Sequence, residues 1–98
     1  MSQIKRELEY SKRFLRAYSR YIGKDKKRRA CIHETLHTLC NNPSDDSLKT
    51  HPLKGELKGF FACSCGYDCR IVFALVADKK ARTEKIVLID VGTHDDVY

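Results

Sequence analysis

The string HETLH at residues 33–37 fits the H-E-x-x-H pattern with which a helix holds zinc in metallopeptidases. On a helix, His33 and His37 stand one turn apart on one face, with Glu34 beside them as a possible general base. A catalytic zinc needs a third protein ligand, which His51 or His94 would have to supply from a distant part of the chain. Nothing in the spacing of these histidines indicates that they meet.

The helical register also bears on a zinc site. Ile32 and Leu36 mark the buried stripe of this helix, so His33 and His37 lie about 100° around the helix from that stripe. We therefore expect two exposed imidazoles at the flank of the helix and no metal site.

Three cysteines, Cys63, Cys65 and Cys69, lie close together in a C-x-C-x3-C spacing. This spacing lacks the paired C-x2-C knuckles of structural zinc sites, and a strand sends Cys63 and Cys65 to the same face. We interpret them as small hydrophobic side chains of a strand and a turn. The odd total of five cysteines, in a chain without a secretion signal, indicates reduced thiols.

The composition is that of one basic globular domain, residues 1–98, with 42% hydrophobic and 33% charged residues. The chain has no stretch of about 18 apolar residues and no apolar signal region at its charged N-terminus, so we expect a cytoplasmic protein that does not enter a membrane. Nineteen Lys and Arg against 13 Asp and Glu give a net charge of +6. A nucleic acid or an acidic protein is a natural partner, although charge alone fits a merely soluble chain equally well.

Apolar spacings of three and four predict an amphipathic helix over residues 10–22, capped by Ser11 and ended by Gly23. A second helix is expected from Asp25 to residues 41–42, because Pro43 forbids its continuation. The basic run at residues 24–29 is interpreted as its solvated start rather than a phosphate site. The expected buried residues are Phe14, Ala17, Tyr18, Tyr21 and Ile22 in the first helix and Ala30, Ile32, Leu36, Leu39 and Cys40 in the second.

The second half of the chain has strand periodicity. Residues 57–64, 69–76 and 84–92 are rich in β-branched and aromatic side chains and are separated by turn signals, which predicts an antiparallel meander. Residues 3–9 are a weaker candidate for a short edge strand. The expected fold is α+β, with two helices on one face of a small, mainly antiparallel sheet and the other face left for solvent or a ligand.

Two segments carry a resemblance to a known family: HPLKGELKGFFACSCGYDCRIVFAL at residues 51–75 and LIDVGTHDDVY at residues 88–98. With the helix-helix-meander order, they resemble the RelE/ParE superfamily of type II toxins, most closely its YafQ-like ribonuclease branch. The resemblance implies a toxin that cleaves mRNA, usually in the ribosomal A site, without a metal or other cofactor. It also implies a cognate antitoxin, expected to be acidic, that forms a hetero-oligomer with the toxin and silences it.

The resemblance implies a catalytic site made from His51, Asp68, His94 and Tyr98, with Arg70 on the phosphate. Cleavage by the 2′-hydroxyl needs a base, an acid and stabilisation of charge on the phosphate. We expect His94 to be the acid and either His51 or Asp68 to be the base. Tyr98 is suited to stack on a base or to hold a phosphate through its hydroxyl.

Lys54 and Lys58 are further candidates for phosphate contacts, although exposed lysines are more often simply solvated. The chain departs from the family pattern at Ser64, where YafQ-like members often carry a histidine, and at Cys69, where they carry an aromatic residue. These departures leave the assignment of acid and base open.

Each site residue also has a structural interpretation. Asp68 can close the CGYD turn, His51 can be an exposed loop residue, and Arg70 can pair across strands with Glu84 or Asp90. The alternative functions are a ParE-like toxin that inhibits DNA gyrase and a non-catalytic RNA-binding module.

Overall fold

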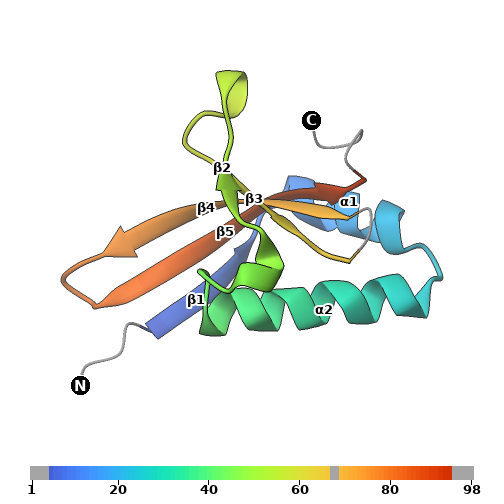
Figure 1. Cartoon of the computed structure of the whole chain (residues 1–98), viewed down its shortest axis with the longest axis horizontal. Coiled ribbons are helices and arrows are strands. Elements are labelled where there is room, and N and C mark those ends of the chain that lie inside the picture. Colours follow the sequence, from blue (N-terminus) through green and yellow to red (C-terminus); the bar gives the residue numbers. More distant parts are fainter. Residues whose placement is uncertain (1–4, 67–68, 94–98) are drawn as a thin grey trace.

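The computed structural model describes residues 5–66 and 69–93, and in it two helices pack on a five-stranded sheet with the order β1-β5-β4-β3-β2 (Figure 1). The elements are β1 (Lys5–Tyr10), α1 (Lys12–Ile22), α2 (Lys26–Asn41), β2 (His51–Pro52), β3 (Phe61–Ser64), β4 (Arg70–Asp78) and β5 (Thr83–Gly92), with short 3-10 helices at Asp46–Leu48 and Gly55–Leu57. The expected α+β fold is confirmed. No helix among the described residues is long and apolar enough to cross a membrane.

Both helix starts follow from their caps. The Ser11 hydroxyl accepts a hydrogen bond from the Phe14 N–H at 3.0 Å, and the Asp25 carboxylate accepts from Lys27 N–H and Arg28 N–H. These side chains satisfy backbone donors that have no partner inside the first turn of a helix. The predicted boundaries are therefore confirmed, except that Tyr10 ends β1 instead of beginning α1.

The main core lies between the two helices and the sheet. Phe14 from α1, Ile32 and Leu39 from α2, and Phe73 and Leu88 from the sheet are at most 1% exposed. These side chains belong to one hydrophobic cluster, so burial of the two helices depends on a single apolar layer.

The prediction that Ala30 belongs to the core is wrong. Ala30 is exposed, because it precedes Ile32 by two residues and so lies about 200° around α2 from the buried stripe. Four other expected core residues are only half-buried and pack at the edge of the main core, namely Tyr18, Tyr21, Ile22 and Cys40.

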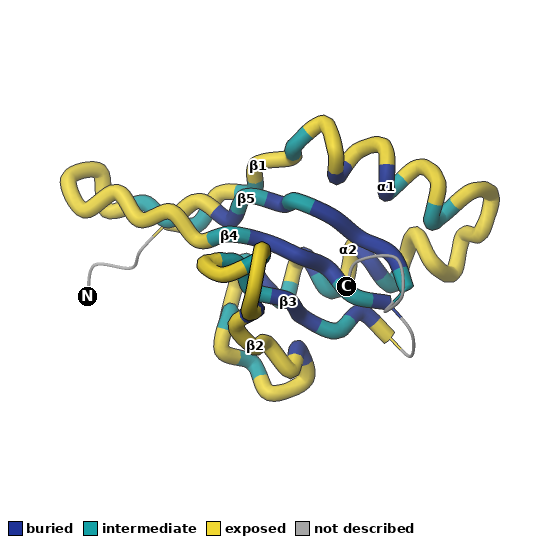
Figure 2. Tube along the Cα trace, turned by 90° about the horizontal axis from the view of Figure 1, so that it is seen from above, coloured by how far each residue is buried: buried dark blue, intermediate teal, exposed yellow. Residues whose placement is uncertain are grey.

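The sheet is a meander extended at both edges. β2, β3, β4 and β5 pair antiparallel in sequence order, and β1 pairs parallel to β5 from Lys5↔Thr83 to Tyr10↔Leu88. Val72 pairs with Asp90 and Phe73 with Leu88, so Ile89 is an extra residue in β5, a β-bulge. The far end of the β4–β5 hairpin is exposed (Figure 2).

The predicted strand 57–64 is too long, since β3 begins only at Phe61. Gly55–Leu57 forms a 3-10 helix, and Gly59 has a φ of 99°, which other residues rarely adopt. This loop folds back over the sheet, and Leu57 and Phe60 pack there with Leu53, Ala62, Val72 and Ile89 in a second small cluster. The sheet face opposite the helices, called the helix-free face below, is therefore partly covered, and the expectation that it is left to solvent or a ligand is wrong for that part.

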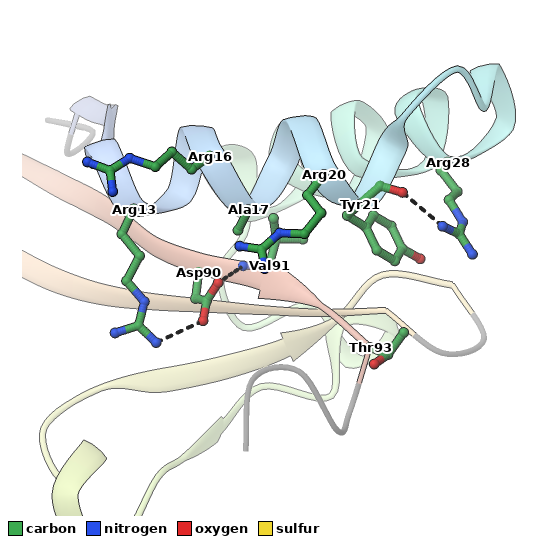
Figure 3. A pocket seen from close by; sticks show the side chains of 9 residues that line it. All are labelled: Arg13, Arg16, Ala17, Arg20, Tyr21, Arg28, Asp90, Val91 and Thr93. Atoms are coloured by element: carbon green, nitrogen blue, oxygen red, sulfur yellow. Dashed lines mark hydrogen bonds and ion pairs between the residues drawn. The ribbon is translucent and has the colours of Figure 1, made fainter.

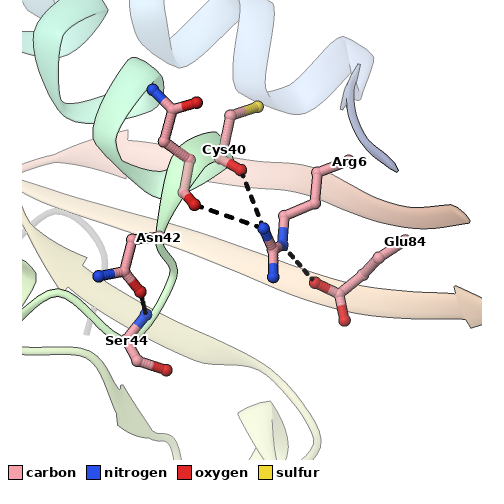
Figure 4. Close-up of polar contacts among 6 residues, drawn as sticks. Arg6, Cys40, Asn42, Ser44 and Glu84 are labelled. Atoms are coloured by element: carbon pink, nitrogen blue, oxygen red, sulfur yellow. Dashed lines mark hydrogen bonds and ion pairs between the residues drawn. The ribbon is translucent and has the colours of Figure 1, made fainter. Parts of the chain in front are cut away.

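Arg6 joins three elements (Figure 4). It pairs with Glu84, its neighbour across the β1–β5 ladder, at 3.2 Å, and its Nη1 donates to the carbonyl oxygens of Cys40 and Asn41 at 3.4 Å. The last carbonyls of a helix have no intrahelical donor and carry partial negative charge, so a cation stabilises them. Arg6 therefore links β1 and β5 to the C-terminus of α2.

We expect Arg6→Ala to lower the free energy of unfolding by about 1–2 kcal/mol, because it removes an ion pair and two helix-end contacts. Lys85→Ala is the matched control, since Lys85 pairs with Glu9 across the same two strands but at 3.8 Å and with side chains 50% and 56% exposed. Its expected loss is below about 0.5 kcal/mol. Urea unfolding followed by circular dichroism measures both, and equal losses would contradict the role given to Arg6.

Candidate functional site

A row of four residues crosses the helix-free face. His51 pairs with Ala62, Ala62 with Val72, and Val72 with Asp90, and residues directly opposite each other share a face of the sheet. Ala62 and Val72 belong to the second small cluster, which places the whole row on the side away from the helices. Neighbouring strands lie about 4.8 Å apart, so His51 and Asp90 are separated by roughly 14 Å of sheet.

A second row runs beside the first. Ser64 pairs with Arg70 and Arg70 with Gly92, and Arg70 precedes Val72 by two residues, so Arg70 shares the helix-free face with His51. Arg70 is half-buried, and its Nη1 donates to the Cys69 carbonyl oxygen at 3.0 Å. These two predicted site residues thus lie on one face of the sheet.

The interpretation that Arg70 pairs across strands with Glu84 or Asp90 is wrong. Glu84 pairs with Arg6, and Asp90 pairs with Arg13 from α1. Among the described residues, no carboxylate lies within ion-pair distance of Arg70.

His51 lies at the β2 edge of the sheet and is exposed. Its Nδ1 is 3.1 Å from the Lys49 carbonyl oxygen, a distance at which Nδ1–H donates and the lone pair of a neutral ring sits on Nε2. Lys54 and Lys58 flank the 3-10 helix Gly55–Leu57 that follows β2, and both are exposed.

Asp68, His94 and Tyr98 lie outside the described residues, so their predicted roles remain predictions. The residues next to two of them are described: Cys69 follows Asp68, and Thr93 precedes His94. β3 ends at Ser64, β4 begins at Arg70 and β5 ends at Gly92, and these three residues are partners in one row.

A pocket of about 400 Å³ opens between α1 and the end of β5 (Figure 3). Pairing of β1 with β5 stops at Leu88, where the chain turns into α1, so beyond that point α1 runs beside β5 in place of a strand. We call it the arginine pocket, and its lining residues are Arg13, Arg16, Ala17, Arg20, Tyr21, Arg28, Asp90, Val91 and Thr93.

The arginine pocket holds four guanidinium groups and one carboxylate. Arg13 Nη2 donates to Asp90 Oδ2 at 3.0 Å, and the other Asp90 oxygen accepts from the Val91 N–H at 2.9 Å. No carboxylate in the described part of the chain lies within ion-pair distance of Arg16 or Arg20. Arg28 pairs with Asp25 at 3.7 Å. The described lining of the pocket therefore has a net positive charge, which comes from Arg16 and Arg20.

Tyr21 and Arg28 form one wall of the arginine pocket. The Arg28 guanidinium carbon lies 4.5 Å from the centre of the Tyr21 ring, and its Nη1 donates to the Tyr21 carbonyl oxygen at 2.8 Å. Burial, together with the neighbouring Cys69 thiol, raises the pKa of Tyr21 to about 12, so the phenol keeps its proton near neutral pH. Its contact with Cys69 joins the pocket to the residue that follows Asp68.

None of the residues that line the arginine pocket was predicted as a site residue from the sequence. A signal was present, because Arg13, Arg16 and Arg20 follow each other at spacings of three and four and so share one side of α1. What α1 faces there was not visible, since Arg13 and Asp90 are 77 residues apart in the chain.

The HETLH histidines are exposed, as expected, and each has a hydrogen-bonding neighbour. His33 Nε2 lies 2.8 Å from the Tyr18 hydroxyl, and His37 Nε2 lies 3.0 Å from the Asn41 amide nitrogen. Within residues 5–66 and 69–93, no three His, Cys, Asp or Glu side chains gather in a way that could hold a metal ion.

The cysteines are free thiols, and Cys63 and Cys65 are both buried on the helix side, as strand alternation predicts. Cys65 Sγ lies 3.4 Å from Cys31 Sγ of α2. Burial raises the pKa of the Cys31 thiol to about 11, whereas hydrogen bonds from Cys65 and Tyr21 lower the pKa of Cys69.

A family model described as "Bacterial toxin of type II toxin-antitoxin system, YafQ" matches residues 6–98. The crystal structure of YafQ from E. coli strain BL21(DE3) superposes with a TM-score of 0.72 at 23% identity, covering 95% of this chain and 98% of that chain. YafQ in the E. coli DinJ-YafQ toxin-antitoxin complex gives 0.71 at 24% identity, covering 97% and 99%. A metal-bound toxin from Helicobacter pylori gives 0.66 at 26% identity, covering 93% and 97%. No curated protein sequence matches.

We expect Asp90→Asn to strengthen binding to heparin, because it removes the carboxylate that neutralises Arg13 while keeping an oxygen for the Val91 N–H. Glu56→Gln is the control, since Glu56 is exposed and its substitution changes the net charge equally. We expect about a fivefold larger gain in affinity for Asp90→Asn than for Glu56→Gln, corresponding to roughly 1 kcal/mol. Elution from immobilised heparin in a salt gradient measures this, and identical elution of the two variants would contradict the prediction.

Proposed function

The chain belongs to the YafQ family of bacterial toxins from type II toxin–antitoxin systems, within the RelE/ParE superfamily, and we propose that it is a ribonuclease that cleaves mRNA in the ribosomal A site. The observation that carries the proposal is that His51 and Arg70, a proton-transfer group and a phosphate-binding group, lie on one face of the sheet. Net positive charge favours docking on ribosomal RNA.

The proposed reaction is cleavage by the neighbouring 2′-hydroxyl. A base takes the proton of this hydroxyl, the 2′-oxygen attacks phosphorus, and the bond from phosphorus to the 5′-oxygen breaks. An acid protonates the leaving 5′-oxygen, so the products are a 2′,3′-cyclic phosphate and a 5′-hydroxyl. The site must supply two proton transfers and stabilise the added charge on the phosphate oxygens.

His51 is suited to be the base. With Nδ1–H directed at the Lys49 carbonyl, Nε2 carries the lone pair that can accept the 2′-hydroxyl proton. Asp68 is the alternative base, or it orients a histidine, and we assign the acid to His94. These roles come from the family resemblance and from residue chemistry.

The proposed site stabilises the phosphate with cationic side chains. Arg70 presents a planar guanidinium that matches two phosphate oxygens, and we assign the exposed Lys54 and Lys58, in the loop after β2, to add positive charge. Tyr98 is assigned to stack on a base or to hold a phosphate.

The proposed partners are a cognate antitoxin, mRNA and the ribosome. One of the E. coli YafQ structures is a toxin-antitoxin complex with DinJ, and we propose by analogy an antitoxin for this chain with an acidic segment that covers the basic surface. Such a toxin would act in the cytoplasm, where translating ribosomes are found.

We expect His51→Ala to slow cleavage of ribosome-bound mRNA by about 10²–10⁴-fold, the usual contribution of a positioned general base or acid. His37→Ala is the matched control, because His37 is exposed on α2 and belongs to the HETLH string. It should cleave at the wild-type rate. The readout is single-turnover cleavage on programmed ribosomes, with the cyclic phosphate end identified by mass spectrometry.

A message with a 2′-O-methyl group at the cut position should resist the wild-type protein. Cleavage of this message, or equal loss of activity in His51→Ala and His37→Ala, would overturn the mechanism. Inhibition of DNA gyrase supercoiling without RNA cleavage would replace the proposed function with that of a ParE-like toxin.

A further inference from the structure

We infer that the arginine pocket binds a backbone phosphate of single-stranded RNA beside the nucleotide that is cut. This inference rests on the proposed ribonuclease function and adds a subsite to it. None of Arg13, Arg16, Arg20, Arg28 and Tyr21 was among the predicted site residues.

The position of the arginine pocket supports this role. Thr93 lines the pocket and directly precedes His94, the proposed acid. Tyr21 lines it too, and its side chain contacts Cys69, which directly follows Asp68. Asp90, on the pocket floor, is also the last member of the row that begins at His51. The pocket thus adjoins the chain neighbours of two proposed catalytic residues.

The charges of the arginine pocket favour a phosphate group. Arg20 extends over Val91 toward Asp90 (Figure 3), and neither Arg16 nor Arg20 has an ion-pair partner in the described part of the chain. An exposed guanidinium that has no carboxylate partner gains most from a phosphate, which accepts two parallel hydrogen bonds. Asp90 competes with that phosphate for Arg13, so it limits binding of weak anions.

The wall made by Tyr21 and Arg28 favours nucleic acid over an acidic peptide. One face of the Arg28 guanidinium lies over the Tyr21 ring, and the other face is a flat surface on which a base can stack. Stacking on aromatic or guanidinium planes is the usual way in which proteins hold single-stranded RNA, and it works for any base. A chain of carboxylates would use the charges but not this surface.

The test measures binding separately from cleavage. Its probe is a short fluorescein-labelled oligoribonucleotide with 2′-O-methyl groups throughout, which the proposed reaction cannot cut. Arg16→Ala/Arg20→Ala removes two exposed charges from the arginine pocket. Lys79→Ala/Lys80→Ala removes two exposed charges from the β4–β5 turn, at the opposite end of β5. Both variants leave the core untouched, and thermal unfolding followed by circular dichroism checks that each is folded.

Fluorescence anisotropy should show about a tenfold weaker affinity for Arg16→Ala/Arg20→Ala and little change for Lys79→Ala/Lys80→Ala. The slope of log K against log salt should fall by about 0.7 for the pocket variant, since the pocket is proposed to neutralise one phosphate and single strands contribute about 0.7 per neutralised phosphate. Arg28→Lys keeps the charge but loses the planar group, and it should weaken oligonucleotide binding while leaving binding of inorganic pyrophosphate unchanged.

Equal affinities for the two double variants would overturn the inference. So would a result in which the pocket variant loses affinity only for a deca-glutamate peptide, because this would assign the pocket to an acidic protein partner. The outcome is separable from the proposed function. If Arg16→Ala/Arg20→Ala loses RNA affinity but the wild-type protein cleaves no message, the ribonuclease function is refuted and the phosphate site stands. If the wild-type protein cleaves messages but Arg16→Ala/Arg20→Ala binds RNA as tightly as the wild type, the ribonuclease function stands and the phosphate site is refuted.

Discussion

β5 pairs with β1 only as far as Leu88, and this limit makes room for the arginine pocket. At that point the Ser11 N–H donates to the Leu88 carbonyl oxygen, and the Ser11 side chain caps α1, so one residue ends a strand and starts a helix. The last part of β5 then borders α1 instead of another strand. The bulge at Ile89 falls in the same place and directs Asp90 to the helix-free face.

The two faces of the sheet differ in composition and in role. The helix side is an apolar layer against which the helices pack. The helix-free face has only a small cluster under the loop after β2, and around it lie His51, Arg70 and Asp90. Because adjacent strands fix side chains at regular spacings, polar groups on this face are held by the same register that packs the core. Stability and site geometry are therefore coupled through β4 and β5.

The elements with local signals were predictable. Ser11 and Asp25 mark the starts of the two helices, and the β-branched and aromatic content of β4 and β5, with the turn signals between them, predicted the meander and the α+β class. The rest depends on non-local contacts. β2 has two residues and no periodicity, the parallel partner of β1 lies at the other end of the chain, and the Arg13–Asp90 pair joins α1 to β5. His51 and Arg70 could be predicted as site residues from their chemistry and from the family resemblance. The arginine pocket could not be predicted, because its residues come together only in the folded chain.

The parallel ladder between β1 and β5 has a consequence for biosynthesis. Arg6 and Glu84 are 78 residues apart, and at roughly 5–20 residues per second a ribosome needs about 4–16 s to add the second after the first. During that interval β1 has no β5 to pair with and Arg6 has no Glu84 to pair with. The β1–β5 ladder can therefore form only after most of the described chain has been translated.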